Sequence, residues 1–348
     1  MVRRICLVLL IIALAVNSAA CSSNKLTRYE AEFIMLFDTM TRIVSYTESK
    51  KEFSDNVQLI YDNLKEYHEL YDIYHNYEGI NNIKTINDNA GIAPVKVDQR
   101  IIDLIRFSQE WYAKTDGKVN IAYGAVLKIW HDYRTAGTDD PENAELPPLD
   151  KLEAAAGHTD IKKVIIDEAA STVFLEDPEM SLDVGAIAKG YATEQISRMM
   201  MERGFTSGLI SVGGNVRSIG NKRDTGLPWN VGIQNPDTAS NEKELFIVDL
   251  TDSSLVTSGN YERFYTVNGM NYHHIIDPGT QFPSKYFTAV TIICKDSGVA
   301  DALSTAVFNM PFEQGFEFIE ELPETEALWV FGNGEIEYSS HFRDYIKK

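Results

Sequence analysis

Short strand-like segments dominate the second half of the chain, and they restrict the possible folds more than any other feature. Beyond residue 160, runs of Val, Ile, Leu, Thr and Phe predict β-strands over residues 164–166, 172–175, 209–212, 229–233, 245–250, 264–267, 288–294 and 327–331. Apolar residues spaced by three and four predict helices over residues 53–74, 101–112, 186–203, 298–310 and 312–322. Because these elements follow no regular βαβ repeat, the pattern predicts an α+β fold. The 348 residues allow one large domain or two moderate ones.

Two polar stretches are expected to be surface connections. Residues 76–95 are rich in Gly, Asn and Asp and show little apolar periodicity, and residues 135–148 are similarly polar.

The N-terminus is typical of an exported bacterial lipoprotein. Arg3 and Arg4 precede an apolar run over residues 5–16, which suits a signal peptide and is too short to cross a bilayer comfortably. Small residues then lead to Cys21, and this arrangement resembles a lipobox. We therefore expect a signal peptide at residues 1–20, lipidation of Cys21, a tether at residues 21–32 and a location at the outer face of the bacterial cell membrane. Ordinary cleavage, with Cys21 as a bystander thiol, is the alternative.

The charge balance argues against nucleic acid as a partner. The chain has 32 Lys and Arg against 51 Asp and Glu, for a net charge of -19, which repels a phosphate backbone at long range. A small anionic molecule can still bind where a metal ion, a lysine or a helix N-terminus offsets the repulsion.

One segment has the features of such an anion site. Asp183 stands at the end of a strand-like run, residues 180–184, and leads into the helix predicted at 186–203. Gly185 and Ala186 let a ligand approach the backbone, the helix N-terminus offers free N–H groups, and Lys189 adds a full positive charge. The same spacing is common at ordinary helix starts, so the segment alone leaves both interpretations open.

Two further groups of residues could carry chemistry. His274 lies three residues before Asp277-Pro278, and alternation in an extended segment places it on the face opposite Ile275. An isolated histidine of this kind is more often structural. Asp301 and Thr305 share one face of a predicted helix, where their oxygens could bind a hard cation such as Mg²⁺ or Ca²⁺. The structural alternative for Asp301 is an acidic residue near the helix N-terminus that the helix dipole stabilises.

Taken together and in order, five segments resemble the successive signatures of the ApbE-type FAD:protein FMN transferase family. The segments are DVGAIAKGYATE, SVGGN, TSGNYER, HHIIDP and VADALSTA, and the similarity extends over roughly residues 33–340. The resemblance implies one large α+β domain at residues 33–348, with mixed β-sheets, flanking helices and a T-fold-like core. It also implies an enzyme that takes FAD and Mg²⁺, esterifies a threonine of an acceptor protein with FMN and releases AMP. The family's acceptor motif is Asp-Gly-x-Ser/Thr-Gly-Ala-Thr.

The same resemblance implies roles for individual residues. Flavin contacts would come from Phe37, Tyr74, Gly117, Lys118, Val119, Asp183, Lys189 and Ile275. The metal would bind the main-chain oxygen of Ala186 together with Asp301 and Thr305, and His274 would be the catalytic histidine.

Two other functions remain compatible with these residues. With water in place of the threonine, the same site would be an FAD pyrophosphatase that gives FMN and AMP. A non-catalytic flavin-binding lipoprotein is the second alternative. The presence of His274 together with Asp301 and Thr305 favours catalysis over binding alone.

Overall fold

The computed structural model describes residues 26–348. The predicted signal peptide and Cys21 lie outside the described residues, so their assignments stay predictions.

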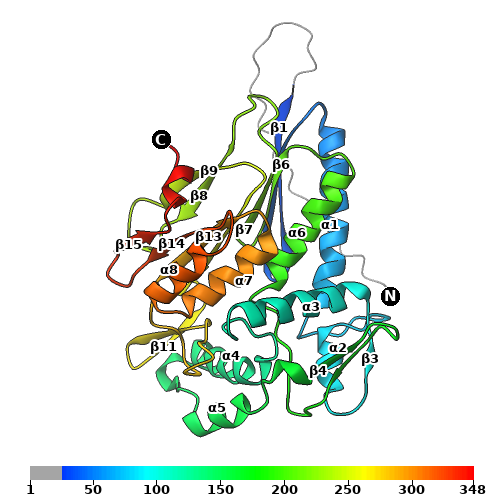
Figure 1. The fold of residues 1–348 in the computed structure, drawn as a ribbon, viewed down its shortest axis with the longest axis vertical. Coiled ribbons are helices and arrows are strands. Elements are labelled where there is room, and N and C mark those ends of the chain that lie inside the picture. The colour runs from blue at the N-terminus through cyan, green and yellow to red at the C-terminus, as the bar shows by residue number, and fades with distance from the viewer. Residues whose placement is uncertain (1–25) are drawn as a thin grey trace, which may run out of the picture.

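An eight-stranded antiparallel sheet forms the centre of the molecule, with the strand order β1-β2-β6-β7-β10-β13-β14-β15 (Figure 1). Its strands are β1 (Thr27–Leu36), β2 (Thr39–Thr47), β6 (Gly208–Val212), β7 (Asn215–Ile219), β10 (Ser254–Gly259), β13 (Ala289–Cys294), β14 (Glu326–Val330) and β15 (Ile336–Tyr338). Side chains alternate between the two faces of each strand, and both faces are covered. The sheet is therefore the middle layer of the fold.

Helices cover one face of this sheet. They are α1 (Lys50–Tyr71), α6 (Ala188–Glu202), α7 (Ser297–Phe308) and α8 (Phe312–Glu320). The apolar stripe of α1 that the sequence predicts, including Phe53, Ile60 and Leu64, is buried in the main core. Helices α6 and α7 pack against each other as well as against the sheet, which brings two motif segments together.

A β-hairpin and the C-terminal turn cover part of the opposite face. The hairpin consists of β8 (Trp229–Gln234) and β9 (Glu244–Leu250), and the turn is a 3-10 helix, η3 (Phe342–Tyr345). A second core forms between them and the sheet, where Val248, Leu255 and Phe342 are buried. In Figure 1 the hairpin and the C-terminus lie on the other side of the sheet from α1 and α6.

A further layer of small elements lies below the central sheet in Figure 1. A three-stranded sheet has the order β3-β5-β4, and a two-stranded hairpin is formed by β11 and β12. The elements of this layer are α2 (Ile83–Asp88), β3 (Val95–Lys96), α3 (Gln99–Lys114), α4 (Gly124–Asp139), α5 (Leu149–Ala156), β4 (Val164–Asp167), β5 (Thr172–Leu175), β11 (Phe264–Val267) and β12 (Met270–His273). Within residues 26–348, no helix combines the length and hydrophobicity that a bilayer-spanning segment requires.

The α+β prediction is confirmed, and apart from the strand-like run at residues 180–184, each strand and helix predicted from the sequence is present within a few residues of its expected position. Two loop predictions are wrong in part. Residues 76–95 contain α2, whose Ile83 and Ile86 are buried, and residues 135–148 begin inside α4. Helix α2 has only six residues, too few to produce a visible apolar period.

Two other expectations need correction. Residues 180–184 are not a strand, because only Ser181 bridges to Tyr123. Residues 27–32, which the sequence analysis assigns to the tether, belong to β1 and pair with β2, so the folded region begins before Phe33.

Candidate active site

A cavity of about 270 Å³ lies between the central sheet and the layer that contains α4. Its lining combines the C-terminal end of β10, the start of α6, one face of α7, one face of α4 and the segments at 118–123 and 274–278. Segments far apart in the chain thus meet at one place.

Most of the residues singled out from the sequence line this cavity. They are Tyr74, Lys118, Val119, Asp183, Ala186, Lys189, His274, Ile275, Asp301 and Thr305. Phe37 and Gly117 do not line it. Phe37 occupies the β1–β2 turn with φ of 54°, and its N–H donates to His68 Nδ1 at 3.2 Å. Gly117 has φ of 79° in the turn that precedes Lys118, a conformation that favours glycine.

The loop before α6 positions Asp183 and Lys189. The Gly185 N–H donates to Asp183 Oδ1 at 2.8 Å, and Lys189 Nζ donates to the Gly185 carbonyl at 3.2 Å. No side chain caps the N-terminus of α6, where Ile187 is the N-cap residue. Burial raises the pKa of Asp183 above its usual value, although nearby His131, Lys189 and Arg134 oppose that shift. The loop therefore presents a helix start and a lysine to the cavity.

Asp301, one of the three predicted metal ligands, lies where α6 packs on α7. The Gly190 N–H donates to Asp301 Oδ2 at 2.8 Å. A Cβ atom on Gly190 would lie 2.3 Å from the Ser297 carbonyl oxygen and 2.4 Å from Asp301 Cβ, so only glycine permits this close approach of the helices. Burial raises the pKa of Asp301, with Lys189 opposing the effect.

The chemistry of these donors suits a hard cation. Ala186, Asp301 and Thr305 all line the cavity and offer a carbonyl, a carboxylate and a hydroxyl oxygen. Within residues 26–348, a single hydrogen bond, from the Gly190 N–H, reaches the buried Asp301 carboxylate. A divalent cation there would compensate the burial of its charge, so the residues present fit Mg²⁺.

The two adjacent histidines have different environments, as alternation predicts. His273 is 7% exposed, its Nε2 donates to the Ser284 carbonyl at 2.8 Å, and its Nδ1 accepts from the Ile275 N–H at 3.2 Å. Both ring nitrogens of His273 are thereby occupied by hydrogen bonds to the backbone. His274 instead lines the cavity, and its buried Nδ1 has no hydrogen-bond partner in the part of the chain that the structure describes. Alternation fails one residue later, because Ile275 and Ile276 also line the cavity after the bend at His274.

Burial and nearby positive charge hold His274 neutral. Burial is the larger cause, followed by Arg263, His273, Arg134 and Lys189, and together they lower the pKa of His274 to about 3. A neutral histidine with a free ring nitrogen can accept a proton. The same cations make the free protein's His274 a weaker base than an ordinary histidine.

Several residues that line the cavity have a buried polar atom without a hydrogen-bond partner in residues 26–348. These atoms are Tyr123 Oη, Asn215 Oδ1, His274 Nδ1 and Asn309 Oδ1. Leaving such an atom unsatisfied costs about 1–3 kcal/mol, so native proteins rarely do so without a ligand or water. Their concentration here indicates a polar ligand. Tyr123, Asn215 and Asn309 are not among the site residues predicted from the sequence, although Asn215 ends the SVGGN segment.

Two arginines that the sequence analysis did not single out also line the cavity. Arg134 from α4 and Arg263 join Lys118 and Lys189 there, and Lys118 Nζ forms an ion pair with Asp277 Oδ1 at 3.0 Å. Burial lowers the pKa of Arg134. The Tyr74 ring lies 5.5 Å from the His131 ring and adds an aromatic wall. The cavity thus brings four cationic side chains and an aromatic ring together with the carboxylates of Asp183, Glu262 and Asp301.

Fold and cavity together define a class of protein, an α+β enzyme that acts on phosphate groups. Its site combines cationic side chains, oxygen ligands for a hard cation and a neutral histidine, as that chemistry requires. The chain belongs to the ApbE family, whose model matches residues 37–329. This confirms the family resemblance stated from the motifs.

Curated relatives and a solved structure agree with this assignment. The chain is 34% identical over 278 residues to the FAD:protein FMN transferase of Treponema pallidum (strain Nichols), covering 76% of this chain and 75% of that protein. It is 31% identical over 259 residues to an FAD:protein FMN transferase of Klebsiella pneumoniae (strain 342), covering 74% and 77%. In three dimensions it is similar to the ApbE protein of Thermotoga maritima, with a TM-score of 0.80, 29% identity and coverage of 92% and 100%.

Proposed function

We propose that this protein transfers FMN from FAD to a threonine hydroxyl of an acceptor protein and releases AMP, with Mg²⁺ as the cation. One observation carries the proposal: His274, with its unpartnered Nδ1, lines the same cavity as the oxygen donors Ala186, Asp301 and Thr305. Membership of the ApbE family and the relatives named FAD:protein FMN transferase support it.

The reaction exchanges one phosphate ester bond for another. The threonine oxygen forms a bond to the FMN phosphorus of FAD, and the bond between that phosphorus and the bridging pyrophosphate oxygen breaks, so AMP leaves with the bridging oxygen. In this proposal His274 Nδ1 accepts the hydroxyl proton, because it is buried, neutral and unpartnered. Lys189, Arg134 and Arg263 stabilise the negative charge on the phosphates. Mg²⁺ held by Ala186, Asp301 and Thr305 would neutralise part of that charge.

In this proposal the flavin contacts residues that line the cavity. Tyr74, Val119 and Ile275 provide aromatic and apolar surface for a ring system, while Lys118, Asp183 and Lys189 provide polar contacts. Gly117 shapes the turn that presents Lys118, and Phe37 lies at the β1–β2 turn, beside Thr39 of the cavity lining.

One incubation separates the three candidate functions. The purified protein is mixed with FAD, Mg²⁺ and a synthetic peptide that carries the Asp-Gly-Ala-Ser-Gly-Ala-Thr sequence. Peptide that gains the mass of FMN establishes a transferase. FMN and AMP without labelled peptide indicate a pyrophosphatase, and unchanged bound FAD indicates a binding protein.

Matched variants test the role of the cation. Asp301→Ala removes the carboxylate ligand and should abolish most FMN transfer while it retains part of the FAD binding, since the ring contacts are elsewhere. Glu313→Ala removes an exposed acid from α8 and serves as the control. Full activity of Asp301→Ala, or of the parent protein in excess chelator, contradicts metal assistance.

We also propose that the mature protein is anchored by a lipid on Cys21 at the outer face of the bacterial cell membrane, where it would meet an exported acceptor. The apolar run at residues 5–16 and the small residues before Cys21 support this location. In this proposal residues 1–20 are removed as the signal peptide.

A further inference from the structure

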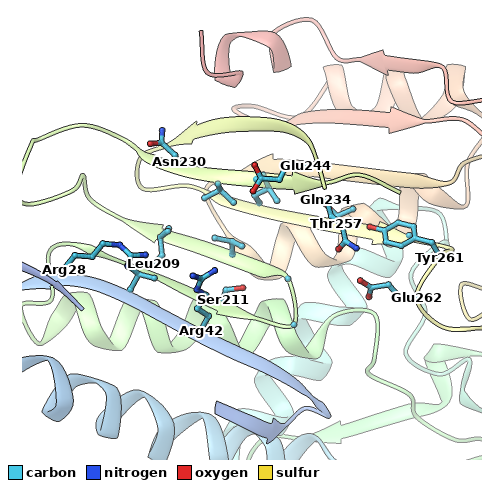
Figure 2. Close-up of a pocket in the computed structure, with 18 residues that line it drawn as sticks. Arg28, Arg42, Leu209, Ser211, Asn230, Gln234, Glu244, Thr257, Tyr261 and Glu262 are labelled. Atoms are coloured by element: carbon cyan, nitrogen blue, oxygen red, sulfur yellow. The ribbon is translucent and has the colours of Figure 1, made fainter. Parts of the chain in front are cut away.

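A second, larger hollow adjoins the cavity on the other face of the central sheet. It is a groove of about 520 Å³ between the sheet and the β8–β9 hairpin. Figure 2 shows Arg28, Arg42 and Ser211 along one wall, Gln234 and Glu244 on the hairpin side, and Tyr261 with Glu262 at one end. None of the residues assigned to flavin or to the metal lines this groove.

The groove opens into the reaction site. Its lining shares Gly213, Thr257, Gly259 and Glu262 with the lining of the cavity. Strand β10 lies where the two hollows meet: Thr257 lines both of them, and Ser258 Oγ, on the opposite face of the strand, lies 3.5 Å from Thr305 Oγ1. Whatever occupies this end of the groove is therefore adjacent to the proposed cation ligands.

The sheet is split at this point. Strand β10 pairs with β13 along its whole length, from Ser254 to Gly259. Its pairing with β7 stops at Leu255, opposite Val216. Strand β7 begins at Asn215, and in the turn before it the Gly213 N–H donates to the Met40 carbonyl of β2 at 3.0 Å.

The split leaves backbone groups of β10 facing the gap. In an antiparallel ladder, successive residues direct their N–H and C=O groups to opposite neighbours. The Asn260 N–H donates to Thr288 on the β13 side, so Gly259 and Thr257 direct theirs toward β7. Within residues 26–348, the strand pairing provides no partner for these two residues on that side. A free strand edge of this kind is a template for an added strand.

We propose that this groove binds the acceptor protein as an extended segment, which pairs through its backbone with β10 at Thr257 and Gly259. The inference rests on the proposed transfer function, because the acceptor threonine must reach the flavin phosphate and this groove leads to it. Glycines line the groove between β10 and the β6–β7 turn, at Gly213, Gly214 and Gly259. A Cβ atom at Gly214 would meet no atom within 4 Å, so the turn leaves open space for such a segment.

Groove variants test the proposal kinetically. Ser211→Trp fills one wall and Gln234→Trp fills the opposite wall, and neither residue lines the flavin cavity. Single-turnover transfer from bound FAD to the Asp-Gly-Ala-Ser-Gly-Ala-Thr peptide is measured against peptide concentration. Both variants should raise the half-saturating peptide concentration at least about tenfold and keep the FAD affinity within about twofold. Thr172→Trp, on the remote strand β5, is the matched control and should behave like the parent.

Hydrogen exchange provides a test that needs no variant of the enzyme. The FAD-loaded protein is mixed with a peptide in which valine replaces the acceptor threonine, so that binding occurs without transfer. The amides of Thr257 and Gly259 should exchange more slowly when the peptide is present. Parental peptide dependence in both groove variants, together with unchanged exchange of these amides, overturns the groove assignment while the transfer function stands. Protection of the amides without any labelling of the threonine peptide supports the groove and contradicts the transferase instead.

Discussion

Replacing each of the adjacent histidines should separate catalysis from stability. His274→Ala removes the proposed proton acceptor, so transfer should fall by about 10²- to 10⁴-fold, the usual contribution of a positioned general base. That loss corresponds to about 3–5 kcal/mol in the activation barrier. The free energy of unfolding should change little, because the substitution breaks no hydrogen bond of His274 Nδ1 within residues 26–348.

The structure predicts the opposite result for His273→Ala. The substitution leaves the Ser284 carbonyl and the Ile275 N–H, both buried, without their partners. Each unsatisfied group costs about 1–3 kcal/mol, so the free energy of unfolding should fall by about 2–6 kcal/mol. The ring's edge contact with Phe308, at 5.7 Å between centroids, is lost as well.

Two measurements on both variants decide the matter. Urea unfolding gives the change in stability, and single-turnover transfer at saturating FAD gives the chemical step free of binding defects. The reasoning is refuted if His274→Ala transfers at the parental rate, or if it loses as much stability as His273→Ala.

Three further predictions follow from burial, charge and the N-terminal sequence. Burial raises the pKa of Asp301, so its ionised carboxylate destabilises the metal-free protein increasingly as pH rises. In chelator at pH 7.5, Asp301→Asn should therefore melt at a higher temperature than the parent. The variant should also lose the stabilisation that Mg²⁺ with FAD gives the parent. Because burial lowers the pKa of His274 to about 3 in the FAD-free protein, the pH profile of kcat/KM for FAD should show no acid limb near 6.5, and a half-loss of kcat/KM for FAD between pH 6 and 7 contradicts this. Cys21→Ser should leave the membrane fraction or remain unprocessed, and unchanged fractionation and mobility would refute lipidation.

The sequence predicts the parts of the site that are local in the chain. Asp301 and Thr305 lie on one face of α7 because they are four residues apart, and the opposite environments of His273 and His274 follow from alternation. Asn309, Tyr123 and Arg134 could not be identified in this way. Each stands in an ordinary helical or turn context, and only the packing of distant segments brings it to the cavity.

The same limit applies to the fold. The interior strand β13 is buried at every position, so its apolar run is visible in the sequence. Strand β1 is an edge strand with the exposed acid Glu32 on its outer side, and its polar residues mask the pattern. The split beside β10 depends on the register in which β7 pairs with it, up to Leu255 opposite Val216, and no local pattern specifies that register.

The charge distribution explains how a protein with a net charge of -19 can act on a pyrophosphate. Lys189, Arg134 and Arg263 concentrate positive charge in the cavity, and the same side chains contribute to the low pKa of His274. A bound pyrophosphate would oppose their effect, because negative charge nearby favours the protonated form of a histidine. The base would therefore strengthen when the phosphates of FAD occupy the cavity. Binding of the anionic substrate would thus activate the group that we propose deprotonates the acceptor.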